Sequence, residues 1–272
     1  MHPELRALLL ADEEGALHSR ADALERALAG VSAPRSPEML LERLVAFGVT
    51  ANDIVLDLGC GHGQFARQIT AATGARVVAT DVSAARAMET LEAARSAGDE
   101  RVRTLRAAAE ALPLRDRALR FVWCRDMLNH VDLPGAMREC ARILVPGGAM
   151  LVYQTFAADS LEPREADRIY RTFSIVPRNM DPLYFERCAG GAGFAVAERD
   201  VIGGEWREWW EDDGARRTSQ SLLRASRLLR ASDDLRREFG DAAYEFAFAD
   251  QLWGIYQMIG KLQPTAYVLR RE

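Results

Sequence analysis

The feature that most constrains this chain is a short apolar run that leads directly into a glycine-rich loop. Residues 53–58 have the character of a buried strand, and residues 59–63 contain three glycines at alternate positions before a helical pattern begins. Glycines without Cβ atoms let a ligand approach the backbone, and the following helix N-terminus offers free N–H groups to a negative group. Strand, loop and helix together predict a cradle for a nucleotide-like ligand.

A carboxylate at the end of the next apolar run extends this cradle. Residues 76–81 read as a second strand ending at Asp81, where an acid is well placed to accept hydrogen bonds from both hydroxyls of a ribose. The simpler interpretation is a glycine turn that only closes a strand–helix–strand unit, but the ordered set of features favours a ligand site. A dinucleotide fingerprint would need Gly or Ala where Gln64 stands, and no Lys-Ser/Thr pair closes the loop as in a P-loop.

Three segments carry a resemblance to a known family. The run VLDLGCGHG (55–63) resembles motif I of the class I S-adenosylmethionine-dependent methyltransferases, and AEALPLRDRALRFV (109–122) and RILVPGGAMLV (142–152) resemble later segments of that family. The similarity is to the ubiquinone/menaquinone-methyltransferase-like branch, and it covers about residues 40–157. It implies a Rossmann-like fold, S-adenosyl-L-methionine as cofactor and methyl transfer as the reaction.

The order of apolar runs predicts an α/β fold with a seven-stranded, mostly parallel sheet. Strands are expected at 53–58, 76–81, 101–106, 119–124, 148–156, 194–202 and 265–270, and helices between the first five at 63–73, 83–97 and 134–145. In the family that the chain resembles, the last strand inserts antiparallel.

Four segments are expected. Residues 1–36 form an N-terminal helical lid or, equally, ordinary packing helices, and 37–202 form the cofactor-binding domain. Residues 203–263 are too long for a hairpin connection and carry helical periodicity, so they predict a helical cap inserted between strands six and seven. Residues 264–272 return to the sheet as its final strand.

The resemblance implies a cofactor site residue by residue. The loop glycines give the backbone room, an acid before them holds the methionyl amino group, and Asp81 binds the ribose diol. The predicted cofactor contacts are Asp57, Gly59, Cys60, Gly61, Gly63, Asp81, Val82, Ala109, Glu110 and Arg125. One position departs from the family pattern: Ala108 stands where an Asp usually bonds the adenine amine, which puts the strength of binding in doubt but not its location.

The segment after the fourth predicted strand faces the transferring methyl in similar enzymes, so it supplies the catalytic candidates. Methyl transfer from a sulfonium is an in-line displacement that depends on positioning, and a base is needed only when the acceptor is still protonated. His130 is the candidate base because imidazole titrates near neutrality, and its alternative role is to bond backbone and brace the loop. Asp126 either contacts a cationic acceptor or caps the following turn.

The predicted cap is rich in aromatic side chains, which have two interpretations. They line a pocket for a flat acceptor, or they form the core of the cap helices. The set comprises Trp206, Trp209, Trp210, Tyr244, Phe246, Phe248, Trp253 and Tyr256. Tyr153, Gln154 and Thr155, at the end of the fifth predicted strand, are further candidates for the acceptor side.

The composition of the chain limits the classes of partner that we expect it to bind. The net charge of −5 over 272 residues gives no basic field for nucleic acid, and no apolar stretch reaches the length of a membrane span. The four cysteines lack paired metal-ligand spacing, which predicts free thiols, no metal site and a cytoplasmic location.

A small-molecule acceptor, methylated at O, N or C in secondary or cofactor metabolism, is the expectation. Two alternatives stay open: a protein or RNA methyltransferase, which would need a basic groove, and a non-catalytic module that binds the cofactor for regulation or assembly. The sequence does not determine the oligomeric state, and a homodimer is among the options.

Overall fold

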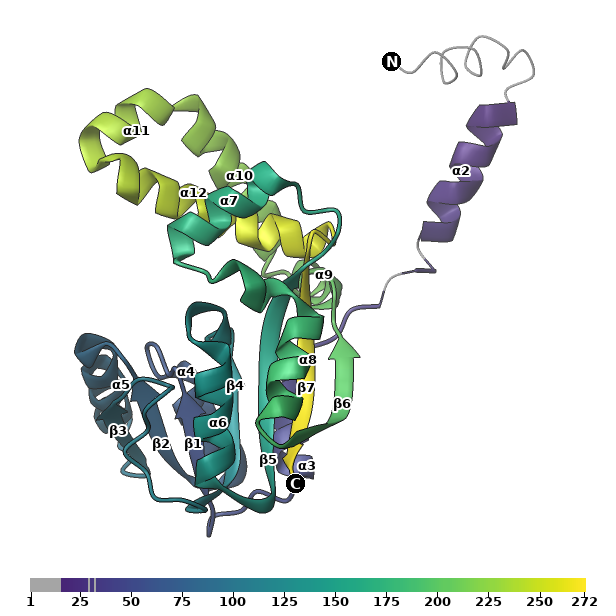
Figure 1. The fold of residues 1–272 in the computed structure, drawn as a ribbon. Coiled ribbons are helices and arrows are strands. Elements are labelled where there is room, and N and C mark those ends of the chain that lie inside the picture. The colour runs from purple at the N-terminus through teal and green to yellow at the C-terminus, as the bar shows by residue number, and fades with distance from the viewer. Residues whose placement is uncertain (1–15, 29, 32) are drawn as a thin grey trace.

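A seven-stranded sheet forms the centre of the molecule (Figure 1). The computed structural model describes residues 16–28, 30–31 and 33–272. The strands are β1 (Ile54–Leu58), β2 (Arg76–Asp81), β3 (Val102–Arg106), β4 (Leu119–Arg125), β5 (Leu144–Ala157), β6 (Phe194–Val201) and β7 (Leu262–Arg271), in the spatial order β3-β2-β1-β4-β5-β7-β6. Neighbours from β3 to β5 are parallel, and β7 is antiparallel to both β5 and β6, so the predicted sheet with its antiparallel last strand is confirmed.

The strand order reverses next to β1, because β2 lies on one side of it and β4 on the other. Loops that leave β1 and β4 at such a point diverge to opposite faces of the sheet and open a crevice at its carboxyl edge. The predicted glycine loop and the segment after β4 therefore meet at this edge.

Helices cover both faces of the sheet because side chains alternate along the central strands. Leu56 and Leu58 of β1 pack on one face with α6 (Leu133–Ile143) and α8 (Pro182–Gly191), while Val55 packs on the other. That second face is covered by α3 (Met39–Ala46) and α4 (Gln64–Thr73), with α5 (Ala84–Ser96) beside β2 and β3.

Two strands begin earlier than predicted. β5 starts at Leu144 rather than at 148, because the chain pairs with β4 on both sides of the Pro-Gly-Gly turn, and the register shifts between Leu119 and Phe121. β7 starts at Leu262, so Pro264 lies inside the strand, where the proline carbonyl still accepts hydrogen bonds.

The cap lies over the carboxyl edge of the sheet and contains α9 (Glu205–Asp212), α10 (Arg217–Arg230), α11 (Ser232–Phe239) and α12 (Asp241–Met258), all within the predicted insertion (Figure 1). The helix α7 (Pro163–Phe173), which precedes β6 and lies outside the predicted insertion, also packs on the cap. Its Ile169 shares an apolar cluster with Tyr256 of α12. The ammonium of Lys261 joins the carboxylate of Glu165 in α7, with Nζ–Oε distances of 2.5 and 2.6 Å. The cap is thus built from two segments of the chain rather than from one.

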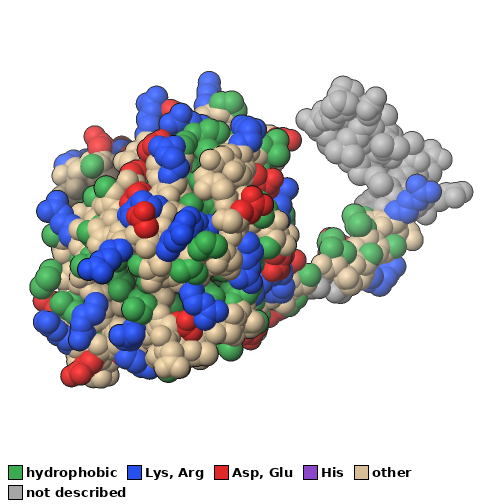
Figure 2. Space-filling model, turned by 60° about the horizontal axis from the view of Figure 1, so that its bottom comes forward, with side chains coloured by type: hydrophobic (Ala, Val, Ile, Leu, Met, Phe, Trp, Pro, Cys, Tyr) green, Lys and Arg blue, Asp and Glu red, His purple; other side chains and the backbone are tan. Residues whose placement is uncertain are grey.

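The N-terminal helix α2 (Ala16–Leu28) stands apart from the rest of the molecule in Figures 1 and 2, and its Leu24 and Leu28 are exposed. The predicted N-terminal helical segment over residues 1–36 is described only in part, since residues 1–15, 29 and 32 lie outside the described residues. Among the described residues, contact with the body begins at Ala33, whose N–H donates to the carboxylate of Glu208 in α9 over 3.1 Å. Arg35 then pairs with Asp200 of β6 and with Glu205 of α9. The lid over the cofactor site stays a prediction.

One contact joins the cap to the sheet and can be tested. Trp206 of α9 is 3% exposed and stacks on Tyr153 of β5, with ring centroids 4.6 Å apart and planes 2° from parallel. Replacing Trp206 by Ala should lower the free energy of unfolding by about 3–5 kcal/mol, because it removes a buried ring and leaves a cavity. Urea denaturation measures the loss. Phe239→Ala, at an exposed position of α11, is the control and should change stability by less than about 0.5 kcal/mol. Equal losses in both variants would show that Trp206 does not anchor the cap.

Candidate functional site

The glycine loop is held against β2 and needs its glycines. The N–H groups of Gly59 and Cys60 both donate to the carbonyl oxygen of Thr80, over 2.8 and 2.9 Å. A Cβ atom on Gly59 would lie 2.3 Å from Cγ of Met127, and one on Gly63 would lie 2.6 Å from Cγ2 of Thr90. Both glycines also have positive φ, 78° and 75°, which other residues rarely adopt. The loop is therefore closely packed from behind and shaped by its glycines.

Asp57 lies within β1 just before the loop and is almost completely buried. Its Oδ2 has no hydrogen-bond partner among the described residues, although the carboxylate lines a cavity. Burial raises the pKa of Asp57 to about 7, with a smaller contribution from the charge of Asp81, while a hydrogen bond from the backbone of Ala66 opposes the shift. Buried polar atoms in proteins are almost always paired, so this oxygen marks a position for a ligand that donates a hydrogen bond.

Asp81, at the end of β2, ties the next part of the site together. Its Oδ2 accepts from the N–H of Gly61 over 3.1 Å and its Oδ1 from the N–H of Ser83 over 2.9 Å. Each carboxylate oxygen has a further lone pair, so both can still accept from a ligand. Val82, which follows, is 68% exposed, and it lines a second cavity together with Asp81.

The segment that departs from the family pattern lies opposite Asp81. Ala108 and Ala109 line the cavity beside Asp81, and Ala108 forms a short antiparallel bridge with Ala111. The carboxylate of Glu110 accepts from the N–H of Asp132 over 2.9 Å, which fixes it toward the segment after β4. With Ala at 108, this wall offers backbone groups and the Glu110 side chain.

Three cavities follow the carboxyl edge of the sheet and share lining residues. We name them the Asp81 cavity of about 320 Å³, the Asp57 cavity of about 630 Å³ and the His130 cavity of about 520 Å³. Gly59 lines the first two, Asp126 lines the Asp57 and His130 cavities, and His130 lines the His130 and Asp81 cavities. The three cavities therefore form one connected site, and Asp126 and His130 lie where its parts meet.

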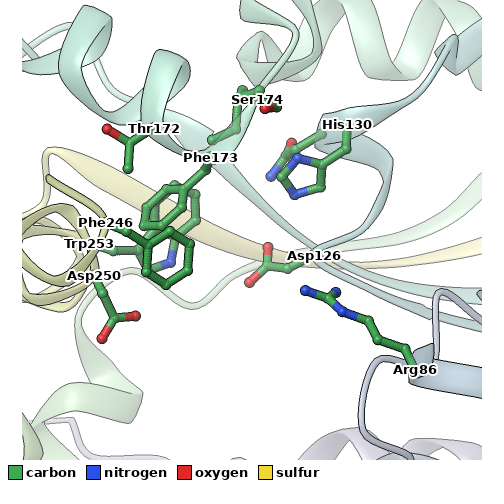
Figure 3. A pocket seen from close by; sticks show the side chains of 11 residues that line it. Arg86, Asp126, His130, Thr172, Phe173, Ser174, Phe246, Asp250 and Trp253 are labelled. Atoms are coloured by element: carbon green, nitrogen blue, oxygen red, sulfur yellow. The ribbon is translucent and has the colours of Figure 1, made fainter. Parts of the chain in front are cut away.

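Asp126 follows β4 in a left-handed backbone conformation with φ of 47°. Its N–H donates to the carbonyl of Tyr153 and its Oδ1 accepts from the N–H of Thr155, both over 2.8 Å. Burial raises its pKa, and the charge of Arg125 opposes this. Asp126 does not cap the following turn, which was one of its two predicted roles. Its carboxylate instead accepts from β5 and points into the His130 cavity (Figure 3). Strained backbone held by two hydrogen bonds is typical of functional sites.

His130 ends the short 3-10 helix η1 (Leu128–His130), and its backbone N–H donates to the carbonyl of Met127 over 3.1 Å. Its ring forms no hydrogen bond with any residue that the structure describes, so the bond to backbone that a bracing role requires is not observed. Figure 3 shows the ring beside the same cavity as the Asp126 carboxylate.

Arg125 lies in an aromatic setting that the sequence did not predict. Its guanidinium carbon is 4.3 Å from the ring centroid of Phe65, 5.1 Å from that of Tyr153 and 5.5 Å from that of Trp206. These rings hold the guanidinium in place, and the residue lines the Asp57 cavity. Phe65 was visible in the sequence only as the first apolar residue of a helix.

The cap aromatics divide between the two predicted roles. Trp206, Tyr244, Phe248 and Tyr256 are buried in apolar clusters, whereas Phe246 and Trp253 line the His130 cavity and Trp209 and Trp210 line the Asp57 cavity. Phe173 of α7 joins Phe246 and Trp253 in edge-to-face contacts, and Asp250 of α12 and Arg86 of α5 complete this wall (Figure 3). Phe173, Asp250 and Arg86 carry no sequence signal, because tertiary packing alone brings them together.

The end of β5 supports the site from behind. Tyr153, Gln154 and Thr155 are buried and do not line the three cavities, contrary to the expectation that they face an acceptor. The amide of Gln154 donates to Asn129, and Thr155 is bonded by Gln257 of α12. These contacts position the segment after β4.

Other candidates lie outside the site or have simple roles. His62 is exposed, bonds Glu89 over 2.6 Å and lines the Asp57 cavity. All four cysteines are free, and burial raises the pKa of the Cys60 thiol to about 11. Within residues 16–28, 30–31 and 33–272, no group of His, Cys, Asp and Glu side chains could hold a metal ion.

Comparison with known proteins agrees with this geometry. Residues 56–152, which run from within β1 through the glycine loop and Asp81 into β5, match a family model described as a methyltransferase domain. This part of the chain, about a third of its length, is therefore similar to a methyltransferase domain. The predicted resemblance is therefore confirmed for the family, whereas its quinone-methyltransferase branch is not.

The curated relatives match less than half of this chain. Over 130 residues, the chain is 35% identical to methyltransferase GfsG of Streptomyces halstedii, an alignment that covers 47% of this chain and 46% of that protein. It is 32% identical over 119 residues to 27-O-demethylrifamycin SV methyltransferase of Amycolatopsis mediterranei, with coverage of 43% and 44%. The alignments thus span less than half of these relatives' own length.

Solved structures extend the similarity to most of the fold. A putative sarcosine dimethylglycine methyltransferase from Galdieria sulphuraria aligns with a TM-score of 0.66 at 19% identity, covering 86% of this chain and 84% of that one. The [4+2]-cyclase SpnF aligns with a TM-score of 0.65 at 22% identity, covering 86% and 81%. At such identities the fold is shared, and the second name shows that the fold is not restricted to methyltransferases.

The raised pKa of Asp57 predicts a pH-dependent cost to stability. The folded protein retains a proton on Asp57 up to about pH 7, whereas the unfolded chain loses it near pH 4, so this group destabilises the fold as pH rises between these values. Asp57→Asn should therefore gain stability relative to the wild type as pH rises from about 4.5 to 8. Urea denaturation at several pH values measures the difference in the free energy of unfolding between the two proteins. The contributions of all other carboxylates are common to both proteins and cancel in this difference. Parallel curves for the two proteins would contradict the assignment.

Proposed function

We propose that this chain is an S-adenosylmethionine-dependent methyltransferase that acts on a small molecule. The observation that carries the proposal is the buried Oδ2 of Asp57, which lacks a partner in the described structure and faces the Asp57 cavity beside the glycine loop. The ammonium of the methionyl part of the cofactor would supply the missing donor, and its positive charge would favour the ionised carboxylate. The cofactor supplies an electrophilic methyl group on a sulfonium.

The residues along the site fit the remaining parts of this cofactor. Asp81 accepts from the ribose hydroxyls, and the exposed side chain of Val82 and the backbone of Ala109 flank the adenine in the Asp81 cavity. Gly59 lines both cavities, so the backbone passes close to the cofactor between its two ends. The guanidinium of Arg125 faces the Asp57 cavity, where it would bind the methionyl carboxylate.

The reacting end lies where the Asp57 and His130 cavities meet, at Asp126. The acceptor would occupy the His130 cavity against the aromatic wall of Phe173, Phe246 and Trp253, which excludes water from the displacement. His130 can take a proton from a hydroxyl or ammonium acceptor, and the Asp126 carboxylate attracts a cationic group. The site therefore favours positioning with optional base assistance.

The finer expectations remain proposals. Figure 2 shows basic, acidic and hydrophobic side chains intermixed on the face turned to the viewer, which supports a small molecule over a nucleic acid as acceptor. No helix among the described residues has the length and apolar character that a bilayer crossing requires. The cytoplasmic location and the ubiquinone/menaquinone-methyltransferase-like branch stay predictions, which cell fractionation and substrate assays test. A homodimer stays one option for the oligomeric state, which light scattering measures.

A non-catalytic module that binds the cofactor is the second candidate, favoured by the loss of a side-chain acceptor at Ala108. Turnover with labelled S-adenosylmethionine and candidate acceptors separates it from an enzyme.

The ribose assignment predicts the effect of Asp81→Ala. The variant should bind S-adenosylhomocysteine about 10–100-fold more weakly, because the ribose hydroxyls lose a charged acceptor. Calorimetry gives the affinity, and circular dichroism checks the fold. Glu92→Ala is the matched control, since it removes an exposed carboxylate from α5 outside the three cavities. Unchanged affinity in Asp81→Ala would refute the ribose contact.

The role of His130 predicts a kinetic effect without a binding effect. If His130 is a general base, His130→Ala should lower kcat by about 10²–10⁴-fold with little change in cofactor affinity, and the acid limb of the pH–rate profile should disappear. Glu92→Ala, which removes an exposed carboxylate of α5 outside the three cavities, is the control and should retain the wild-type profile. A stable, fully active His130→Ala protein would remove the base role and make Asp126 the next residue to test.

A further inference from the structure

A fourth cavity, inside the cap, is lined by three arginines and one carboxylate among other residues, and methyl transfer itself does not explain it. This cap cavity has a volume of about 220 Å³ and lies between α9, α10 and α12. Its lining residues are Arg207, Arg217, Gln220, Ser221, Arg224, Asp250, Gln251, Trp253 and Gly254. Three guanidinium groups thus face a single carboxylate, that of Asp250.

These guanidinium groups lack the partners that arginines usually have. In the part of the chain that the structure describes, none of the three forms an ion pair with a carboxylate. Arg207 donates from Nε and Nη2 to the amide oxygen of Gln257, over 2.9 and 2.5 Å, and Arg217 lies over the ring of Trp210 with 4.4 Å from its guanidinium carbon to the centroid. Arg207 therefore keeps Nη1 available, and Arg217 is positioned by a ring rather than by a charge.

The environment of Arg207 is built around its guanidinium. A Cβ atom on Gly254 would lie 3.0 Å from Nη1, so the glycine leaves space beside this donor. Burial lowers the pKa of Arg207 and the charge of Arg217 lowers it further, while Tyr153, Asp126 and Asp250 oppose the shift. A bound anion would relieve both unfavourable effects.

The cap cavity adjoins the site already described. Asp250 and Trp253 line both the cap cavity and the His130 cavity, and Arg217 lines both the cap cavity and the Asp57 cavity. Gln257, which binds Arg207, also donates to Oγ1 of Thr155 over 3.3 Å, and the N–H of Thr155 donates to Asp126. A molecule that reaches from Asp126 past Trp253 would place its far end among the arginines.

We propose that the cap cavity binds a phosphate group of the acceptor. The inference rests on the proposed function, and it names the class of acceptor: a small phosphorylated molecule whose uncharged part lies against Phe173, Phe246 and Trp253. Guanidinium groups match the geometry of phosphate oxygens, and the excess of two positive charges balances a phosphate monoester, which carries about −1.5 to −2 at pH 7. A single carboxylate would leave a positive charge uncompensated.

The test titrates inorganic phosphate into the full chain, with and without S-adenosylhomocysteine, at constant ionic strength set by chloride. The wild type should show saturable binding by calorimetry, and acetate should bind more weakly. Arg224→Gln should weaken phosphate binding about tenfold, because it removes a charged donor from an exposed position where folding is not at stake. Arg207→Gln should do the same. Arg227→Gln, one turn further along α10 and outside the cavity, should bind phosphate as the wild type does.

The contrary results are equally definite. Absence of saturable phosphate binding, an equal loss in Arg227→Gln, or acetate binding as tight as phosphate would overturn the inference. Loss of S-adenosylhomocysteine affinity in Arg224→Gln and Arg207→Gln, with phosphate binding retained, would assign the arginines to the cofactor carboxylate instead. A wild type that binds S-adenosylhomocysteine but not phosphate refutes only this inference, whereas one that binds phosphate but not S-adenosylhomocysteine refutes the proposed function.

Discussion

The burial of one carboxylate, that of Asp57, governs the arrangement of this site. A charge at the end of β1 can be kept out of water only where surrounding donors compensate it, and here one oxygen is left without a partner in the described structure. The closely packed loop between Met127 and Thr90 maintains this geometry. The buried carboxylate thus lowers the stability of the fold at neutral pH and leaves an acceptor unpaired in the cavity, a trade-off that is common at functional sites.

The topology places this local feature beside a second cavity at the same edge of the sheet. Because the strand order reverses beside β1, the glycine loop and the segment after β4 open toward the same crevice, with the cap above it. Asp126 lies at the point shared by the Asp57 and His130 cavities, held by two hydrogen bonds to β5. Cofactor and acceptor would therefore meet at a residue fixed by the sheet rather than by a loop.

The sequence predicted those parts that local chemistry determines. The strand, the loop and Asp81 are close in the chain, and glycine spacing and apolar periodicity encode them directly. The left-handed conformation of Asp126 could not be read, because it depends on backbone partners in β5. The membership of α7 in the cap was missed for a similar reason: an amphipathic helix shows which side is buried but not which helix covers it. The division of aromatic residues between core and cavity likewise depends on tertiary packing.

The two-segment construction of the cap has a consequence for how molecules enter and leave. α7 is joined to the sheet through β5, and α9 to α12 through β6 and β7, so no single loop can swing the cap aside. Gly203 and Gly260, both with positive φ, flank the longer segment and are natural hinge positions. Opening must bend these connections together while the cluster of Ile169 and Tyr256 stays intact. Such collective hinge motion occurs in microseconds to milliseconds, which makes product release a step that can limit turnover.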